Sequence, residues 1–370
     1  MRQRRRILEA ILAVTVLSLL TWLLLREREP SYREKKLSVW LEEARRRGET
    51  SDLFNDALIE TRTATALRAM GADSLPTLLR MVQTRDSAYR RALVKLSEEQ
   101  PWLWLHTRPL DEVRIKAVHG FAVLGPAAKP ALPKLAALLR DQDPDVRLVA
   151  AVCLGKIGSA DAVPALQKYL DDINRRNATK REGKWLAAWA LGAIGPAARP
   201  ALPQLVLLTN DSDYMVQIAA QAAIVRITGE GLGPWTQALQ DTSNTTNWLR
   251  AARIVQFIGT NAAPAIPFLL LSLQQTNFAI QENALQALGR IHSRPEVCIP
   301  ALTPLLQSTN GFICTHTLET LRAFGRSNGS LAPTSELFRC LLDPSDMVRA
   351  QASNALRQLV PVAAAKAGIE

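Results

Sequence analysis

A short turn that ends a helix recurs along this chain at nearly constant spacing. Measured between the second residues of successive turns, the steps from Gly125 to Gly325 are 33, 37, 33, 31, 33 and 33 residues. A period of this length is typical of a solenoid, in which no single repeat can bury its apolar face alone. The turns lie at Met70-Gly71, Leu124-Gly125, Ile157-Gly158, Ile194-Gly195, Ile227-Thr228, Ile258-Gly259, Ile291-His292 and Phe324-Gly325.

Each repeat has the pattern of two helices joined by a polar turn. After Gly125, residues 131–139 (Ala-Leu-Pro-Lys-Leu-Ala-Ala-Leu-Leu) form the first predicted helix. The acidic turn at 141–145 offers side-chain oxygens that cap the second helix. Residues 146–157 then place apolar side chains on one face at helical spacing, and Gly158 supplies the left-handed residue that ends a helix.

Some recurrences are nearly literal. The segment Gly-Pro-Ala-Ala-Lys-Pro-Ala-Leu-Pro at 125–133 returns at 195–203 with Arg in place of Lys. The segment Leu-Gly-x-Ile closes the second helix at 154–157, 191–194 and 288–291. We therefore predict an all-α fold, a right-handed α-solenoid of stacked antiparallel helical hairpins. We expect the solenoid to span residues 61–360, followed by a disordered tail over 361–370.

The proline-bearing first helix, the Asp-rich turn and the Val-Arg opening of the second helix together resemble the HEAT repeat family. In that family an Asp and an Arg six positions apart bond across neighbouring repeats as a ladder. The matching positions here are Asp141 with Arg147 and Asp343 with Arg349. The unit at Asp211 has Gln217 in place of Arg, so the resemblance implies an incomplete ladder.

A hydrophobic run precedes the repeats. Residues 7–25 are almost entirely apolar, and at ~1.5 Å per residue they reach about 28 Å, close to the hydrocarbon thickness of a bilayer. The alternative is a cleavable signal peptide, but the run ends in Trp-Leu-Leu-Leu-Arg-Glu-Arg-Glu, which lacks the small residues of a cleavage site. We predict one transmembrane helix that anchors the chain, within residues 1–27.

The distribution of charge bears on orientation. Of the net charge of +11, residues 1–50 carry +5, from 12 basic and 7 acidic residues on both flanks of the hydrophobic run. Because the positive-inside rule counts basic residues, the two flanks compete. We favour an N-terminus in the cytoplasm and a solenoid on the extracytoplasmic side of the inner membrane.

Leu-Ser-Val-Trp-Leu at 37–41 and Arg-Asp-Ser at 85–87 resemble bacterial single-pass HEAT proteins.

The juxtamembrane segment, residues 28–60, contains an amphipathic helix predicted over 36–47. Its apolar side carries Leu37, Trp40, Leu41 and Ala44. One interpretation is an N-terminal cap that covers the first hairpin, which solenoids require. The alternative is a helix that lies on the membrane, since three arginines follow directly. We favour the cap.

Two interruptions of the period are candidate partner-binding sites. Residues 98–109 contain two tryptophans, which either anchor a partner or pack against their own repeats. Residues 171–184 form an insertion rich in basic side chains, which is either a solvated loop or a contact for an acidic partner or lipid headgroup. The candidate residues are Trp102, Trp104, Arg175, Arg176, Lys180, Arg181 and Lys184.

No catalytic or metal-binding motif stands out. The four histidines are isolated, and the sequence has no phosphate loop, nucleophile elbow or dinucleotide fingerprint. We therefore predict no cofactor and no enzymatic activity. The four cysteines form no Cys-x-x-Cys pair, and only Cys298 and Cys314 are close enough in sequence to suggest a disulfide between adjacent helices.

These features favour a membrane-tethered scaffold or assembly factor that binds protein partners on the surface of its solenoid. Two alternatives stay open. Some HEAT-like proteins resemble bilin lyases, which are enzymes, although no residue here marks that activity. Other HEAT arrays bind nucleic acid or anionic lipid along a basic groove, but Arg147, Lys184, Arg250 and Arg349 are sparse for such a groove. The sequence leaves the oligomeric state and the partner's identity open.

Overall fold

Helices make up nearly all of the described structure. The computed structural model describes residues 29–46, 61–85, 110–175 and 183–369 of the 370-residue chain. Within these ranges the two strands, β1 (Ser31–Tyr32) and β2 (Lys35–Lys36), form a small antiparallel hairpin with Ser31 opposite Lys36. The predicted anchor and the tryptophans at 102 and 104 lie outside the described residues.

The helices alternate between an inner and an outer layer. Each inner helix packs against the next inner helix along the chain. The inner helices are α6 (Leu110–Leu124), α8 (Pro144–Ile157), α10 (Lys184–Ile194), α12 (Tyr214–Thr228), α14 (Thr245–Ile258), α16 (Phe278–Ile291), α18 (Gly311–Ala323) and α20 (Asp346–Leu359). The outer helices are α4 (Leu75–Val82), α7 (Leu132–Leu138), α9 (Val163–Arg175), α11 (Leu202–Leu208), α13 (Gly233–Ala238), α15 (Ile266–Ser272), α17 (Pro295–Leu302) and α19 (Thr334–Cys340).

Short 3₁₀ segments and three terminal helices complete the chain. The 3₁₀ segments flank the outer helices, where prolines shape the turn: η1 (Gly71–Ser74), η2 (Gly125–Ala131), η3 (Ala160–Ala162), η4 (Gly195–Ala201), η5 (Gly259–Ala265), η6 (Thr303–Gln307) and η7 (Arg326–Leu331). The terminal helices are α2 (Leu37–Arg46), α3 (Arg62–Met70) and α21 (Pro361–Lys366).

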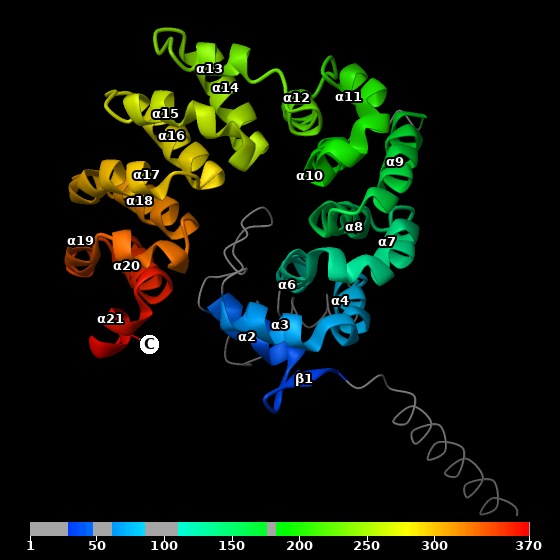
Figure 1. Ribbon diagram of the computed structural model, residues 1–370, viewed down its shortest axis with the longest axis horizontal. Coiled ribbons are helices and arrows are strands. Elements are labelled where there is room, and N and C mark those ends of the chain that lie inside the picture. The colour runs from blue at the N-terminus through cyan, green and yellow to red at the C-terminus, as the bar shows by residue number, and fades with distance from the viewer. Residues whose placement is uncertain (1–28, 47–60, 86–109, 176–182, 370) are drawn as a thin grey trace, which may run out of the picture.

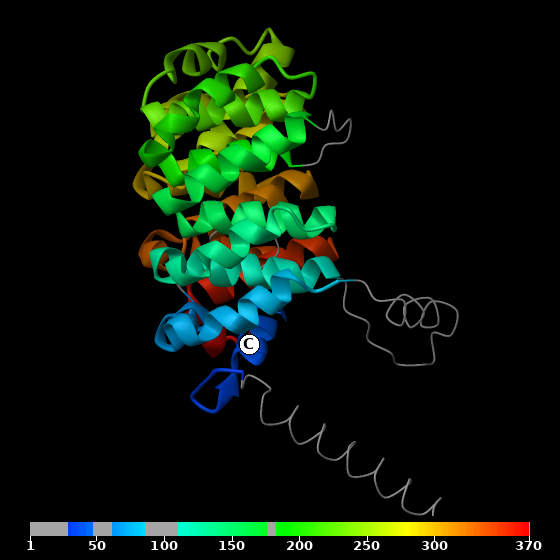
Figure 2. The same ribbon diagram turned by 90° about the vertical axis from the view of Figure 1, so that its right-hand side faces the viewer.

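The stack is strongly curved. Figure 1 shows the inner helices lining a concave side, the outer helices on the convex side, and the last hairpins turning back towards the N-terminal helices. In Figure 2 the successive hairpins are layered one above another. This is the stacked-hairpin solenoid that the period predicts.

Side-chain caps fix where the inner helices begin. The Asp143 carboxylate accepts a hydrogen bond from the backbone N–H of Asp145, and Asp213 does the same for Met215. Asn277 and Asn310 cap α16 and α18 in the same way. Because these residues recur with the period, each hairpin turns at an equivalent place.

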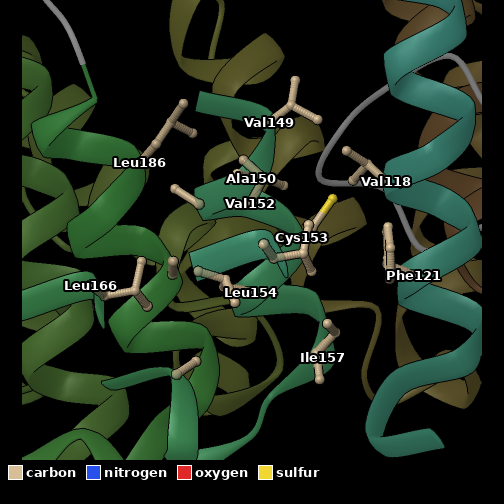
Figure 3. Packing of buried hydrophobic residues seen from close by; sticks show 14 of the residues in the cluster. Val118, Phe121, Val149, Ala150, Val152, Cys153, Leu154, Ile157, Leu166 and Leu186 are labelled. Atoms are coloured by element: carbon tan, nitrogen blue, oxygen red, sulfur yellow. The ribbon is translucent and has the colours of Figure 1, made fainter. Parts of the chain in front are cut away.

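The inner helices approach one another at backbone contact. A Cβ added at Gly155 of α8 would lie 2.8 Å from Cα of Ala190, and one at Gly192 of α10 would lie 2.8 Å from Cα of Ala223. Only glycine fits such a contact, which explains the Leu-Gly-x-Ile segments at 154–157 and 191–194. Figure 3 shows α8 between its neighbours, with Cys153 directed towards α6, which carries Val118 and Phe121. That thiol is fully buried, as predicted for a small apolar side chain.

Helix α2 covers the first hairpin as the cap interpretation expects. Leu37, Leu41 and Ala44 are fully buried, and α2 packs against α3 and α6. A buried ion pair adds to this packing, because the Lys116 ammonium of α6 lies 2.5 Å from a Glu42 carboxylate oxygen. The predicted amphipathic face of α2 is therefore directed at the solenoid.

The C-terminus differs from its prediction. Instead of a disordered tail over 361–370, residues Pro361–Lys366 form α21, which packs against α20 and buries Ala364. Pro361 occupies the start of the helix, where its fixed φ is favourable, and the alanines that follow are strong helix formers. The repeat pattern did not reveal this helix, because the segment lies beyond the last recognisable repeat.

One described stretch, Thr245–Ser272, has the length and mean hydropathy (1.6) of a membrane span. It consists of α14, η5 and α15, which belong to two successive hairpins, and the chain turns sharply at Gly259, where φ is +69°. Trp248 and Ile254 within it are fully buried in the solenoid core. Its apolar character follows from its place in that core.

The close approach at Gly192 can be tested against a matched site. We expect Gly192→Ala to destabilise the fold by about 1–3 kcal/mol, because the new methyl group overlaps the α12 backbone. At Gly289 of α16 a Cβ would lie 3.5 Å from Cα of Thr320, an ordinary contact, so Gly289→Ala is expected to be neutral or stabilising by up to about 1 kcal/mol. Urea unfolding of both variants measures the difference, and equal midpoints would contradict the account.

The cap can be tested at its buried ion pair. Glu42→Ala leaves the Lys116 ammonium, whose side chain is 4% exposed, without its carboxylate, so we expect a loss of about 3–5 kcal/mol. The control is Glu43→Ala, which removes a surface pair with Lys35 and is expected to cost less than about 1 kcal/mol. Thermal unfolding compares the two. A Glu42→Ala variant as stable as Glu43→Ala would show that the pair does not hold the cap.

Candidate functional site

Each inner helix leaves one stripe of side chains partly exposed on the concave side. On α12 the stripe consists of Gln217, Gln221, Ile224 and Thr228, at the spacing of one helix face. The other faces of α12 are buried against α10, α14 and α11. Side chains on these stripes therefore form the concave surface of the solenoid.

Aromatic side chains gather on the middle of this surface. The rings of Trp185 on α10 and Phe257 on α14 meet edge to face, with centroids 6.1 Å apart. Because α12 lies between these helices, the rings can meet only on the side towards which the stack curves. Trp189 follows Trp185 by one turn but is buried, with 9% of it exposed, whereas Ile224 of α12 is partly buried like Trp185 and Phe257. We call Trp185, Ile224 and Phe257 the aromatic patch.

The aromatic patch lies among cationic side chains. Helices α10, α12 and α14 contain no Asp or Glu, whereas they carry four basic residues: Lys184, Arg226, Arg250 and Arg253. Arg253 is exposed, and the Lys156 ammonium lies 5.5 Å from the ring centroid of Trp189. Lys184 is paired with the Asp211 carboxylate, so we expect the exposed Arg253 to favour a partner that carries negative charge over this apolar surface.

The concave surface changes character towards the C-terminus. The His316 ring on α18 lies between two carboxylates, 3.5 Å from Glu282 on α16 and 3.2 Å from Glu319. The hydrogen bond with Glu319 raises the pKa of His316, against the opposing effect of burial. Gln351 on α20 donates to Glu319, which extends the network to a third helix. These polar groups bond to one another, so this half offers fewer free contacts to a partner.

The predicted ladder residues occupy the edge where inner helices begin. Arg147 donates to the main-chain oxygen of Asp141 at 2.8 Å, and Arg349 donates to that of Asp343 at 2.6 Å. The Asp141 carboxylate instead accepts two bonds from Arg85, at 2.7 and 2.9 Å. The side chain at the sixth position thus closes its own turn through a backbone oxygen.

This geometry explains why one unit tolerates glutamine. Gln217 donates to the main-chain oxygen of Asp211 at 2.6 Å, the same bond that the arginines make elsewhere. The position needs a long side chain with an N–H donor, and charge is not essential. The departure from the family pattern at 217 therefore leaves the turn intact.

Bonds between repeats are made by different basic residues. Lys184 on α10 donates to the Asp211 carboxylate of the next hairpin at 2.8 Å, and the buried Arg114 lies 2.7 Å from the Asp143 carboxylate. Burial alone would raise the pKa of Asp211, but the hydrogen bonds from Lys184 and the Asp213 backbone outweigh it and lower that pKa. Lys184, predicted as a partner contact, thus joins two neighbouring hairpins.

Most of the other residues that were predicted to bind a partner lie outside the part of the chain that the structure describes. Arg175 is the last residue of α9, and nothing is described of its side chain, while Trp102, Trp104, Arg176, Lys180 and Arg181 lie outside the described residues. Both interruptions join an outer helix to an inner helix, so their described ends lie at the edge where the inner helices begin. The aromatic patch was not among the predicted sites, although Trp185 and Trp189, one turn apart in a helix without acidic residues, are a signal for it.

The suggested pairing of Cys298 with Cys314 does not occur in this structure. All four cysteines are free and buried. The Cys298 thiol is directed to the main-chain oxygen of Ser293 at 3.5 Å, and burial raises its pKa to about 11. Cys314 lies instead beside Cys340. Among the described residues, no three His, Cys, Asp or Glu side chains are grouped as a metal site.

Comparison with known proteins gives a family match and distant structural likenesses. A search of curated proteins found no match. An engineered protein shares 21% identity over 86% of this chain and 98% of its own, with a TM-score of 0.32. Human deoxyhypusine hydroxylase in complex with glycerol shares 21% over 78% and 98%, with a TM-score of 0.33.

The CpcE–CpcF complex of phycocyanin lyase from Nostoc sp. PCC7120 shares 18% identity over 88% of this chain and 98% of its own, with a TM-score of 0.37. These structures are too distant to carry an argument about the site. The family model described as HEAT repeats matches residues 100–181, which include the Asp-rich turn and helices α7 and α8. Together with the repeated hairpins, this match shows that the chain carries HEAT repeats within residues 100–181.

Proposed function

We propose that this chain is a membrane-tethered scaffold or assembly factor, which binds a protein partner on the concave surface of its solenoid and catalyses no reaction itself. The hydrophobic run at residues 7–25 is the tether. In this proposal the solenoid lies on the extracytoplasmic side of a bacterial inner membrane.

The observation that carries the proposal is the aromatic patch with its cationic surroundings. Tryptophan and arginine are the residues most enriched at binding hot spots, and Trp185 and Arg253 sit on neighbouring parts of one curved surface. Aromatic rings provide rigid contact area, while the exposed guanidinium selects for negative charge. A matching partner segment carries apolar side chains flanked by aspartate or glutamate.

The curvature of the solenoid supports the same conclusion. A concave wall of side chains from α8 to α14 surrounds a bound segment on more than one side, which a flat surface cannot do. The alternative functions are a HEAT-like lyase, which would be an enzyme, and a solenoid that binds nucleic acid. No arrangement of the described residues specifically favours a lyase or a nucleic-acid-binding protein. The four basic residues of α10, α12 and α14 lie near aromatic rings and partly exposed aliphatic groups, which suits a protein partner better than a nucleic acid.

Site-specific photo-crosslinking in native membranes tests the binding surface. A benzophenone amino acid in place of Phe257 is expected to capture one protein, whereas the same probe at Leu207 on the convex face, 76% exposed, is expected to capture none. In the Phe257-probe background, Arg253→Glu should lower the yield about tenfold, because it reverses a charge beside the patch. Lys134 is an exposed residue of the outer helix α7, and Lys134→Glu makes the same charge change there. This control should leave the yield of crosslinked protein unchanged. Equal capture at both probes, or equal effects of both charge changes, would contradict the proposal.

The tether and its direction are tested by a reporter fused after Glu370. Alkaline phosphatase needs an oxidising compartment to form its disulfides, so it is expected to be active in the membrane fraction. Deletion of residues 1–27 should remove both membrane association and reporter activity, because the reporter then stays in the cytoplasm. An active green fluorescent fusion together with an inactive phosphatase fusion would place the solenoid in the cytoplasm instead.

A further inference from the structure

Two thiols are in contact at the junction of the last two repeats. Cys314 lies on the inner helix α18, and Cys340 is the last residue of the outer helix α19. Their sulfur atoms are 4.0 Å apart, and both thiols are directed to the main-chain oxygen of Leu306, at 3.7 and 3.8 Å. Both side chains are buried, with exposed fractions of 1% and 4%.

We propose that Cys314 and Cys340 are a disulfide-forming pair, which a small-molecule disulfide or a thiol–disulfide oxidoreductase oxidises to an intramolecular bond that joins the last two hairpins. The two sulfurs need to approach by about 2 Å to reach the disulfide length. Because both thiols already converge on one carbonyl oxygen, the side chains are directed towards each other. Cys298, by contrast, is directed to Ser293.

The exchange proceeds in two balanced steps. The Cys340 thiolate attacks one sulfur of the oxidant, forms a mixed disulfide and releases the first small thiolate. The Cys314 sulfur then attacks Sγ of Cys340, which breaks the mixed disulfide and releases the second small thiolate. The protons of the two protein thiols end on the two released thiols, and the oxidant gains the two electrons that the cysteines lose.

The electrostatics of the pair assign these roles. The hydrogen bond between the two thiols lowers the pKa of the Cys340 thiol, although burial opposes it. The same hydrogen bond, together with burial, raises the pKa of Cys314. Burial raises the pKa of Cys153 and of Cys298. Of the four thiols, Cys340 is therefore the one favoured to form the attacking thiolate.

The position of the pair gives the bond a structural consequence. Helices α19 and α20 form the last hairpin, which contacts one neighbouring hairpin and α21, whereas a hairpin inside the stack contacts two. Terminal repeats of such arrays open most readily. A bond between residues 26 apart in sequence, on α18 and α19, would tie the last hairpin to the one before it. The proposal does not depend on the partner-binding function.

The test uses the full-length chain in mild detergent, incubated with oxidised glutathione, then unfolded and alkylated for peptide mass spectrometry. We expect a peptide pair joined through Cys314 and Cys340, with Cys153 and Cys298 alkylated. The control Cys298→Ser should form the same bond, and Cys340→Ala should form none. Four alkylated cysteines, glutathione retained on Cys340, or a bond between another pair such as Cys298 and Cys314 would each overturn the proposal.

Thermal unfolding provides a second test of the Cys314–Cys340 bond, which does not depend on the folding of a variant. Oxidised wild-type chain is expected to unfold several degrees above the reduced chain, and dithiothreitol should reverse the shift. In Cys314→Ala, which keeps a small apolar side chain at this site, the shift between oxidising and reducing conditions should vanish. A bond that forms without any shift would overturn the inferred tie between the two hairpins.

Discussion

The structure depends on how closely successive inner helices approach one another. Gly155 against Ala190 and Gly192 against Ala223 bring the backbones of α8, α10 and α12 into contact. Among the described outer helices, no glycine makes such a backbone contact. The stack curves towards its closely packed inner layer, which lines the concave side (Figure 1).

Curvature in turn creates the candidate binding site. Trp185 and Phe257 belong to inner helices with a third helix between them, yet their rings touch because the stack bends there. The same bend brings Arg253 into a region where α10, α12 and α14 supply no carboxylate. Towards α20 the polar side chains are bonded to one another, as at His316 and Glu319. The binding capacity that we propose is thus concentrated in the middle of the array.

The sequence predicted the architecture well because the repeated residues act locally. The capping role of the turn at 141–145 and the left-handed Gly158 depend only on neighbouring atoms, and both are confirmed. The ladder was harder to predict, because residue spacing does not reveal that Arg147 bonds to a main-chain oxygen while Arg85 takes the Asp141 carboxylate. The aromatic patch could not be predicted from a single repeat, since it exists only where distant repeats meet.

The central claim is that a partner covers the middle of the concave surface, and hydroxyl-radical footprinting of the full chain in its native membranes tests it most directly. The account predicts that Trp185 and Phe257 are less oxidised in native membranes than in the purified chain. It predicts that the exposed Leu207 on α11 and Leu342 in the turn after α19 are oxidised equally in both. Equal oxidation of the aromatic patch in the two preparations, or protection confined to the convex leucines, would contradict it.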